Sequence, residues 1–198
     1  RHPKWKMGKK ISVDSATLMN KVLELTEALK LFSFKINKFE IVIHPQSLIH
    51  AIVKFRNGTT YFLYHVPDMK IPISNALFDG NFNYYKYFKN TYKNNMINQN
   101  LEFLPVDQNK FTTLSLISKM NRSKSSPIII NAANEIFVDE FLKNSIKFSD
   151  IFMYLNLVLK DKNYIKTSNM SCNSIKNIYK IDVWARELAY KIIKKNTN

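Results

Sequence analysis

The sequence predicts an α/β or α+β unit with a short β-sheet, followed by a C-terminal helical domain of the four-helix-bundle type. Three observations support this prediction. Apolar residues at helical spacing come first, strand-like runs flank Asn57-Gly58, and amphipathic segments joined by short connections follow. We assign residues 1–78 to the first unit, 79–104 to a linker and 105–198 to the helical domain.

The first helix is expected from about Ser15. The segment before it contains Pro3 and Gly8 and follows neither a strand nor a helix period, so we interpret it as a loop. Asp14 and Ser15 are favourable N-cap residues. Beyond them, apolar residues alternate between spacings of four and three, which places them on one helix face. This stripe consists of Leu18, Val22, Leu25, Leu29 and Phe32.

Three strands are expected next, at residues 39–44, 48–55 and 59–64. Asn57-Gly58 is the strongest hairpin signal of the sequence and joins the last two. His44 and His50 lie six residues apart across a proline, which is not the spacing of a helical metal-binding pair. We therefore expect both to have a structural role or to lie at the edge of a site.

The linker contains aromatic residues interleaved with Lys and Asn. Such a pattern also occurs where proteins stack on single-stranded nucleic acid. We favour a linker whose aromatic side chains are packed down. The aromatic residues are Phe82, Tyr84, Tyr85, Tyr87 and Phe88.

The remainder of the chain is expected to be helical. Helices are predicted over 111–120, over 131–142, and over about 149–159 with Ser149-Asp150 as its cap. Ser125-Ser126-Pro127 ends the first of these, and a last helix starts at Asp182.

The helix that follows Ser15 has a polar face opposite its apolar stripe. Thr17, Asn20, Lys21 and Glu24 are three or four residues apart, so they lie side by side. Ser15 and the N–H groups of a helix N-terminus suit an anion, and Asn20 and Lys21 add an amide and a positive charge. A phosphate-binding site is therefore one interpretation, with Glu24 holding a divalent cation beside it.

A plainer interpretation of the same residues stays open. Ser15 is then only a helix cap. Lys21 and Glu24 are then only a surface ion pair, which contributes a few tenths of a kcal/mol.

The net charge of +15 comes from 30 basic and 15 acidic residues. Such a charge suits nucleic acid or an anionic membrane as partner. It also arises without selection for binding in an A/T-rich genome, such as that of a reduced-genome bacterium, because the abundant Lys, Asn, Ile, Phe and Tyr have A/T-rich codons. We favour the second explanation and expect neither nucleic acid nor membrane as a partner.

Cys172 is the only cysteine of the 198 residues, so the chain contains no internal disulfide and no Cys-based metal site. Its apolar run at 151–159 is too short to span a bilayer. We expect a cytoplasmic protein.

Residues 2–21 read His-Pro-x-Trp-x-Met-Gly-x-Lys-Ile-Ser-Val-Asp-Ser-Ala-Thr-x-Met-Asn-Lys, with Glu24 shortly after. This run resembles the signature of the 1-deoxy-D-xylulose 5-phosphate reductoisomerase family. These enzymes use NADPH and a divalent metal to make 2-C-methyl-D-erythritol 4-phosphate for isoprenoid precursors. Val22 departs from the family, which usually has Gly there. Asn-Ala-Ala-Asn-Glu at 131–135 and Ala-Arg-Glu-x-Ala at 185–189 resemble the family's C-terminal domain.

The resemblance implies roles for several residues. His2, Ser15, Asn20 and Lys21 would bind the substrate and its phosphate. Glu24 would bind Mn²⁺, Mg²⁺ or Co²⁺ together with carboxylates of an Asp-Ser-Glu motif that the family has upstream. His2, Lys21 and Glu24 are therefore the expected catalytic residues, and residues 1–78 are the expected part of a central catalytic domain.

The resemblance also implies a lid and cofactor contacts. Trp5 and Met7 would belong to a lid that excludes water, and Gly8 would let the cofactor approach the backbone. Met69, within Pro-Asp-Met-Lys-x-Pro-Ile, would lie near the nicotinamide, although such a Met is also common as packing. His65 stands where the family usually has Gly.

The mechanism implied by the resemblance has two stages. The metal polarises the substrate carbonyl while the carbon skeleton isomerises, and NADPH then reduces the branched aldehyde. The sequence lacks Gly-x-Gly-x-x-Gly, so we expect the NADPH-binding domain upstream, in a longer enzyme that is a homodimer. Alone, the chain is expected to be inactive. The alternatives are a non-catalytic nucleic-acid-binding module and an inactive remnant.

Overall fold

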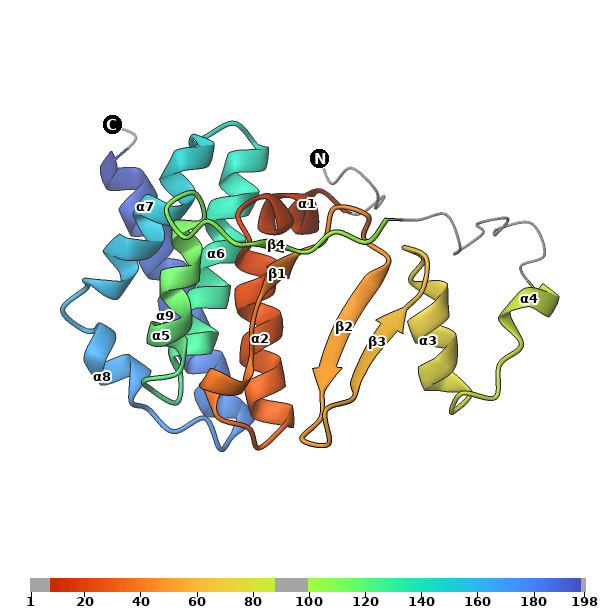
Figure 1. Ribbon diagram of the computed structural model, residues 1–198. Coiled ribbons are helices and arrows are strands. Elements are labelled where there is room, and N and C mark those ends of the chain that lie inside the picture. Colours follow the sequence, from red (N-terminus) through yellow and green to blue (C-terminus); the bar gives the residue numbers. More distant parts are fainter. Residues whose placement is uncertain (1–7, 88–99, 197–198) are drawn as a thin grey trace. The chain divides into compact units, whose positions relative to one another are not determined.

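The computed structural model describes residues 8–87 and 100–196 (Figure 1). Among these residues the chain forms two compact units. The first unit comprises residues 8–41 and 107–196, and the second comprises 42–87 and 100–106. The three domain ranges assigned from the sequence stay a prediction.

The first unit begins with two helices, α1 (Lys9–Ala16) and α2 (Met19–Leu31). The prediction that the first helix starts at about Ser15, with Asp14 and Ser15 as its cap, is wrong, because Lys9–Ala16 forms α1 and both residues lie at its C-terminal end. The segment lacks a helical apolar period, and its only buried residues are Val13 and Asp14. The helix therefore depends on packing against the rest of the unit, which local periodicity does not reveal.

The face of α2 that packs into the unit differs from the predicted stripe. Its buried residues are Met19, Val22 and Thr26, and Phe32 is 55% exposed. The side of α2 that carries Met19 packs against α5 and α6, so the residues on that side are the buried ones. Val22 is fully buried in the apolar core and is accommodated there. The other members of the predicted stripe are half-buried: Leu18, Leu25 and Leu29.

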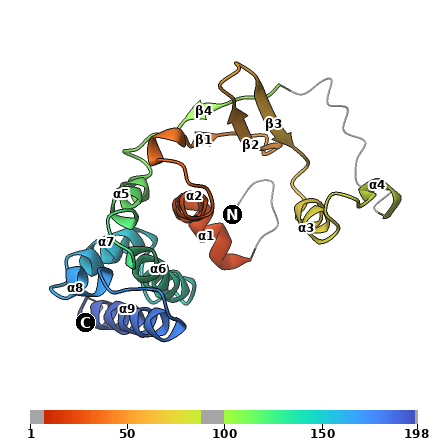
Figure 2. The same cartoon turned by 90° about the horizontal axis from the view of Figure 1, so that it is seen from below.

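The core of the first unit is organised around α6 (Ser126–Leu142). This helix packs against α1, α2, α5, α7 and α9, and Figures 1 and 2 show its position among them. It is buried around most of its circumference, with Phe137 and Ile130 fully covered. The predicted four-helix bundle is not confirmed. The other helices of this region are η3 (Thr112–Ser115), α5 (Leu116–Met120), α7 (Phe148–Leu159), α8 (Tyr164–Ser168) and α9 (Ile175–Asn196).

Of the C-terminal helices, α7 begins close to its predicted cap, whereas α6 and α9 begin earlier than predicted. α7 is capped by Asp150, whose Oδ2 accepts a hydrogen bond from the Lys147 N–H at 2.8 Å. α6 begins at Ser126 rather than Asn131, because Pro127 fits the first turn of a helix instead of interrupting one. α9 begins at Ile175, ahead of the predicted Asp182.

An ion-pair network joins α6 to α9. Arg186 on α9 contacts Glu135 on α6, with Nη2 2.6 Å from Oε2, and its Nε lies 2.8 Å from Oδ2 of Asp182. The two carboxylates raise the pKa of Arg186 by accepting its hydrogen bonds, so the guanidinium stays charged. The network connects the two C-terminal motifs that the sequence singled out.

The second unit contains the predicted hairpin. β2 (Ile49–Lys54) pairs antiparallel with β3 (Thr60–Tyr64), and Gly58 has the positive φ of +88° that favours glycine in the turn. A second pair, β1 (Val42–Ile43) with β4 (Leu104–Pro105), forms a separate two-stranded sheet. The described residues therefore contain two small antiparallel sheets rather than one.

The strand predicted at residues 39–44 is shorter than expected. Of these residues only Val42–Ile43 is paired as a strand, and the 3₁₀ helix η1 (Ile36–Lys38) precedes it. The partner strand of β1 comes from the end of the predicted linker, which local sequence signals do not reveal.

The second unit also contains α3 (Lys70–Leu77) and α4 (Tyr84–Tyr87). Tyr84 is buried and donates a hydrogen bond to Oδ2 of Asp68 at 2.9 Å. Tyr85 and Tyr87 are 74% and 63% exposed, so the prediction that the linker aromatics are packed down is wrong for these two. Phe88 lies outside the described residues. No helix within the described ranges is both long and apolar enough to cross a membrane.

Candidate functional site

The polar face predicted on the first long helix exists at the start of α2. Glu24 accepts hydrogen bonds from Nδ2 of Asn20, at 2.5 Å, and from Nζ of Lys21. The structure thus brings together three of the predicted site residues, one helical turn apart. An amide, an ammonium group and a carboxylate are presented side by side.

This face points to solvent while the opposite side of α2 is buried. The side chains of Lys21 and Glu24 are 44% and 48% exposed, whereas Met19 and Val22 are fully covered. An exposed ion pair contributes little to stability. Both groups are therefore available to a ligand, and the geometry is compatible with a binding site as well as with a plain surface pair.

Ser15 is separated from this face by a turn. It lies near the C-terminal end of α1, so it does not cap the start of α2, where the N–H groups of Met19 and Lys21 donate to Oγ1 of Thr17 and the carbonyl of Leu18. Only Thr17 and Leu18 separate the two helices, and Leu18 has a left-handed backbone with φ of 58°. The turn between α1 and α2 therefore decides whether Ser15 and Lys21 can share a ligand.

The other predicted site residues are not brought to this face by anything the structure describes. His2, Trp5 and Met7 lie outside the described residues. Gly8 is the N-cap residue of α1, with ordinary φ and open space around it. Met69 is 54% exposed and belongs to the second unit.

Glu24 fits a divalent cation as one ligand of a larger set. Its carboxylate is exposed and has only side-chain hydrogen bonds, which a cation can replace. Hard cations need about six oxygen ligands. Within residues 8–87 and 100–196 no three His, Cys, Asp or Glu side chains are grouped so that they could hold a metal ion. The described residues therefore do not form a metal centre by themselves.

Histidines of the second unit have structural contacts. His44 donates from Nδ1 to the carbonyl of Glu102 at 2.8 Å and stacks on Phe103. His50 donates from Nε2 to the carbonyl of His65 at 2.8 Å, and the two rings stack with centroids 3.8 Å apart. These contacts agree with the structural role predicted for His44 and His50, and they show how His65 is accommodated.

Sequence reasoning missed one buried polar pair behind the site. Asp14, interpreted as a cap, is 1% exposed and accepts a hydrogen bond from Nδ2 of Asn134 at 2.8 Å. The available signal was an Asn in the middle of an apolar helical segment, since a buried amide needs a polar partner.

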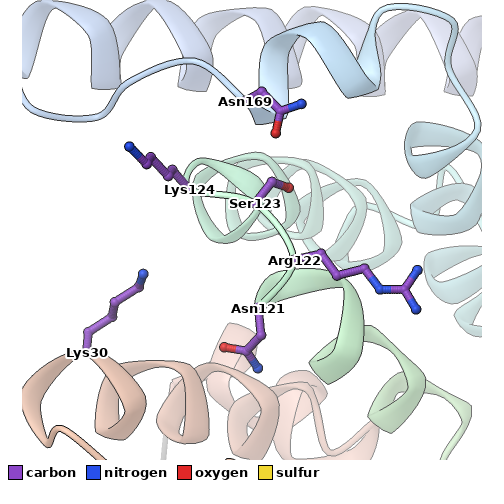
Figure 3. Close-up of a pocket in the computed structure, with 6 residues that line it drawn as sticks. All are labelled: Lys30, Asn121, Arg122, Ser123, Lys124 and Asn169. Carbon is purple, nitrogen blue, oxygen red and sulfur yellow. The ribbon is translucent and has the colours of Figure 1, made fainter.

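A separate hollow of about 310 Å³ lies on the first unit (Figure 3). Lys30, on its edge, is nine residues beyond Lys21 on α2, which is about 13 Å along a helix axis. Its lining contains no carboxylate, and in Figure 3 Arg122 points away from Lys30 and Lys124. The hollow is therefore distinct from the predicted site. It is lined by Lys30, Asn121, Arg122, Ser123, Lys124 and Asn169.

Comparison with known families identifies the class to which these features belong. Residues 65–188 match the family described as "DXP reductoisomerase C-terminal domain". Residues 1–32, which include the polar face and the turn before it, match "1-deoxy-D-xylulose 5-phosphate reductoisomerase C-terminal domain". Both matches are to C-terminal domains of one class of enzyme, the reductoisomerases. The chain belongs to the 1-deoxy-D-xylulose 5-phosphate reductoisomerase family.

The curated proteins that resemble this chain have the name of that family. The 1-deoxy-D-xylulose 5-phosphate reductoisomerase of Wolbachia sp. subsp. Brugia malayi (strain TRS) is 40% identical over 196 residues, which are 98% of this chain and 48% of that protein. The protein of that name from Endomicrobium trichonymphae is 42% identical over 195 residues, 97% of this chain and 48% of its own length. The chain therefore spans about half the length of these relatives.

Solved structures that resemble this chain belong to the same family. A DOX-P reductoisomerase in complex with NADPH, fosmidomycin and magnesium has a TM-score of 0.85 and 34% identity, over 98% of this chain and 48% of that one. The Zymomonas mobilis 1-deoxy-D-xylulose 5-phosphate reductoisomerase with NADPH has a TM-score of 0.81 and 32% identity, over 93% of this chain and 47% of that one.

The exposure of the Lys21–Glu24 pair gives a first prediction. Glu24→Gln removes a solvent-exposed ion pair, so the free energy of unfolding should fall by less than about 0.5 kcal/mol. Urea denaturation followed by circular dichroism measures this change. Glu27→Gln, on an exposed position of the same helix, is the matched control. A loss above about 2 kcal/mol would show that Glu24 supports the fold rather than a ligand.

Proposed function

We propose that this chain provides the substrate-phosphate contacts and one metal ligand of a 1-deoxy-D-xylulose 5-phosphate reductoisomerase. The reaction would yield 2-C-methyl-D-erythritol 4-phosphate for isoprenoid precursors by the non-mevalonate pathway. The observation that supports the proposal is the exposed cluster of Asn20, Lys21 and Glu24, within the motif that the family comparison matches. Similar solved structures bind NADPH, fosmidomycin and magnesium.

The phosphate contacts follow from the chemistry of the face. Lys21 offers a charge, Asn20 an amide donor and Ser15 a hydroxyl, while the start of α2 adds the positive end of the helix dipole. Lys21 and Asn20 both donate hydrogen bonds to the carboxylate of Glu24. Binding of a phosphate would transfer the two donors from the carboxylate to the phosphate oxygens. The exchange costs little, because the pair is exposed.

Release of Glu24 would free its carboxylate for the cation. We propose Glu24 as one ligand of Mg²⁺, Mn²⁺ or Co²⁺. A bound divalent cation supplies Lewis-acid polarisation of the substrate carbonyl. The same helix turn would thus hold the phosphate end of the substrate and face its reacting end.

The remaining roles are proposals that rest on the resemblance. His2 would contact the substrate as a catalytic residue, and Trp5 and Met7 would belong to a lid. Gly8 and Met69 would contact NADPH, which supplies the hydride. The exposed side chain of Met69 is compatible with a cofactor contact.

The rest of the enzyme would come from the other half of the longer relatives. We propose that this half holds NADPH and the other metal carboxylates, because among the described residues Glu24 belongs to no group of three or more His, Cys, Asp or Glu side chains that could hold a metal ion. The 198-residue chain alone is then inactive. We also propose a cytoplasmic location, which rests on the single cysteine, and no role for nucleic acid or membrane.

A homodimer is the proposed state of the whole enzyme. The β2–β3 hairpin exposes large apolar side chains on both of its faces, and such surface is commonly covered by a second subunit. The residues, 49–65% exposed, are Val53, Phe55, Tyr61, Phe62 and Leu63.

Replacing Lys21 should affect phosphorylated substrate selectively. The test enzyme is this chain joined to the upstream half of the Wolbachia relative. In it, Lys21→Ala should lower kcat/KM for 1-deoxy-D-xylulose 5-phosphate about 10- to 150-fold, because the lost charge-assisted hydrogen bond is worth roughly 1.5–3 kcal/mol. For 1-deoxy-D-xylulose the loss should be less than about threefold, since the missing contact is to phosphate. Steady-state NADPH oxidation measures both values.

Lys30→Ala is the matched control, because Lys30 lies on the same helix but lines the separate hollow. It should leave both values unchanged. Equal losses for the two substrates in Lys21→Ala would mean that Lys21 does not bind the phosphate.

The isolated chain should not consume NADPH. With 1-deoxy-D-xylulose 5-phosphate and Mn²⁺, absorbance at 340 nm should stay at the level of the enzyme-free blank, because one carboxylate holds a divalent cation too weakly. Addition of the separately expressed upstream half of the relative should restore oxidation. Turnover by the chain alone would refute the proposed division of the site.

A further inference from the structure

The turn between α1 and α2 is fastened to the helical core by a buried hydrogen bond. Asp14 on α1 and Asn134 on α6 are each 1% exposed, and Nδ2 of Asn134 lies 2.8 Å from Oδ1 of Asp14. The other oxygen of Asp14 accepts from Nζ of Lys10 at 2.8 Å. Both carboxylate oxygens therefore have a partner, which a buried charge requires.

Asn134 is an unusual choice for a helix whose neighbouring buried residues are apolar. Ala133 and Phe137 are fully covered, and the Oδ1 atom of Asn134 has no hydrogen-bond partner in the described part of the chain. A buried acceptor without a partner destabilises the fold. Packing alone would favour an aliphatic side chain here. The hydrogen bond to Asp14 accounts for the amide.

A second contact holds the same turn from another helix. The hydroxyl of Thr113, in η3, donates to the carbonyl of Thr17, which is the residue between Ala16 and the left-handed Leu18. A left-handed backbone is unfavourable for Leu and persists only when its surroundings hold it. Asn134 thus holds the end of α1 before the turn, and Thr113 holds the first residue of the turn itself.

We propose that Asn134 and Thr113 are positioning residues for the polar face. They hold the α1–α2 turn in the one conformation in which Ser15, at the end of α1, and Lys21, at the start of α2, face the same phosphate. This inference rests on the proposed function, since it requires that Ser15 and Lys21 bind the substrate phosphate. Asn134 and Thr113 would thus influence phosphate binding without contacting the phosphate.

The contact can be broken and restored by exchanging its donor and acceptor. Asn134→Asp places a second carboxylate against Asp14, so the two repel at pH 8 and the turn moves. The double variant Asp14→Asn/Asn134→Asp restores an amide–carboxylate pair with unchanged net charge. Asn131→Asp adds the same charge on the same helix, at a half-buried position, and is the matched control.

The measurement is an NMR titration of the 198-residue chain with inorganic phosphate at pH 8. The Kd for phosphate is obtained from the chemical-shift change of the Lys21 amide, and Asn134→Asp should raise it at least tenfold. The same variant should speed hydrogen exchange of the backbone amides of residues 17–21. Exchange in α7 should stay unchanged. The double variant should return within threefold of the parent value, as should Asn131→Asp.

Unchanged affinity and exchange in folded Asn134→Asp would overturn the proposal, as would failure of the double variant to restore them. If Asn134→Asp does not fold, Thr113→Val decides, because it keeps the side-chain shape and removes the hydroxyl donor. It should raise the Kd three- to tenfold, and no change would overturn the proposal.

Lys21→Ala in the same titration separates this inference from the proposed function. If it leaves the Kd unchanged, or the parent chain binds no phosphate, the proposed phosphate site fails. The exchange rates of the turn amides still test the fastening by Asn134. If Lys21→Ala weakens binding and the Asn134 and Thr113 variants do not, the positioning role alone fails.

Discussion

The buried hydrogen bond between Asp14 and Asn134 connects the polar face to the core of the first unit. α1 has little apolar surface of its own, and its buried carboxylate is compensated by an amide from α6 and an ammonium group from Lys10. Loss of Asn134 would leave one oxygen of this buried carboxylate without its partner, and loss of Lys10 would remove the positive charge beside it; both changes are destabilising. This pair helps to hold α1, while α2 is held by its own buried residues Met19, Val22 and Thr26.

The polar face itself shows the opposite design. Lys21 and Glu24 contribute little to the fold because they are exposed, so their contacts can change when a ligand arrives. A rigid, buried support behind exposed, exchangeable groups is the arrangement that an efficient binding site requires. In the proposed enzyme the same turn would present donors to a phosphate and release Glu24 to a cation.

Local signals predicted part of this architecture. The β2–β3 hairpin follows from Asn57-Gly58, and the capped start of α7 follows from Asp150, because both depend on neighbouring residues. The motif led to Asn20, Lys21 and Glu24, which helical spacing places together. The sequence did not reveal α1 or the buried side of α2, because they depend on partners such as Asn134, 120 residues from Asp14 along the chain. β1 was mispredicted for the same reason, since its partner strand is distant.

In the proposed enzyme, this chain contributes Glu24 to a metal site that another part of a longer protein completes. The most direct measurement is the Mn²⁺ dependence of NADPH oxidation by the chain joined to the upstream half of a relative, with and without Glu24→Gln. We expect the joined parent to saturate with Mn²⁺. Glu24→Gln, with an intact fold, should lose turnover by at least a hundredfold at the same Mn²⁺ concentrations. Near-normal turnover of that variant would contradict the account.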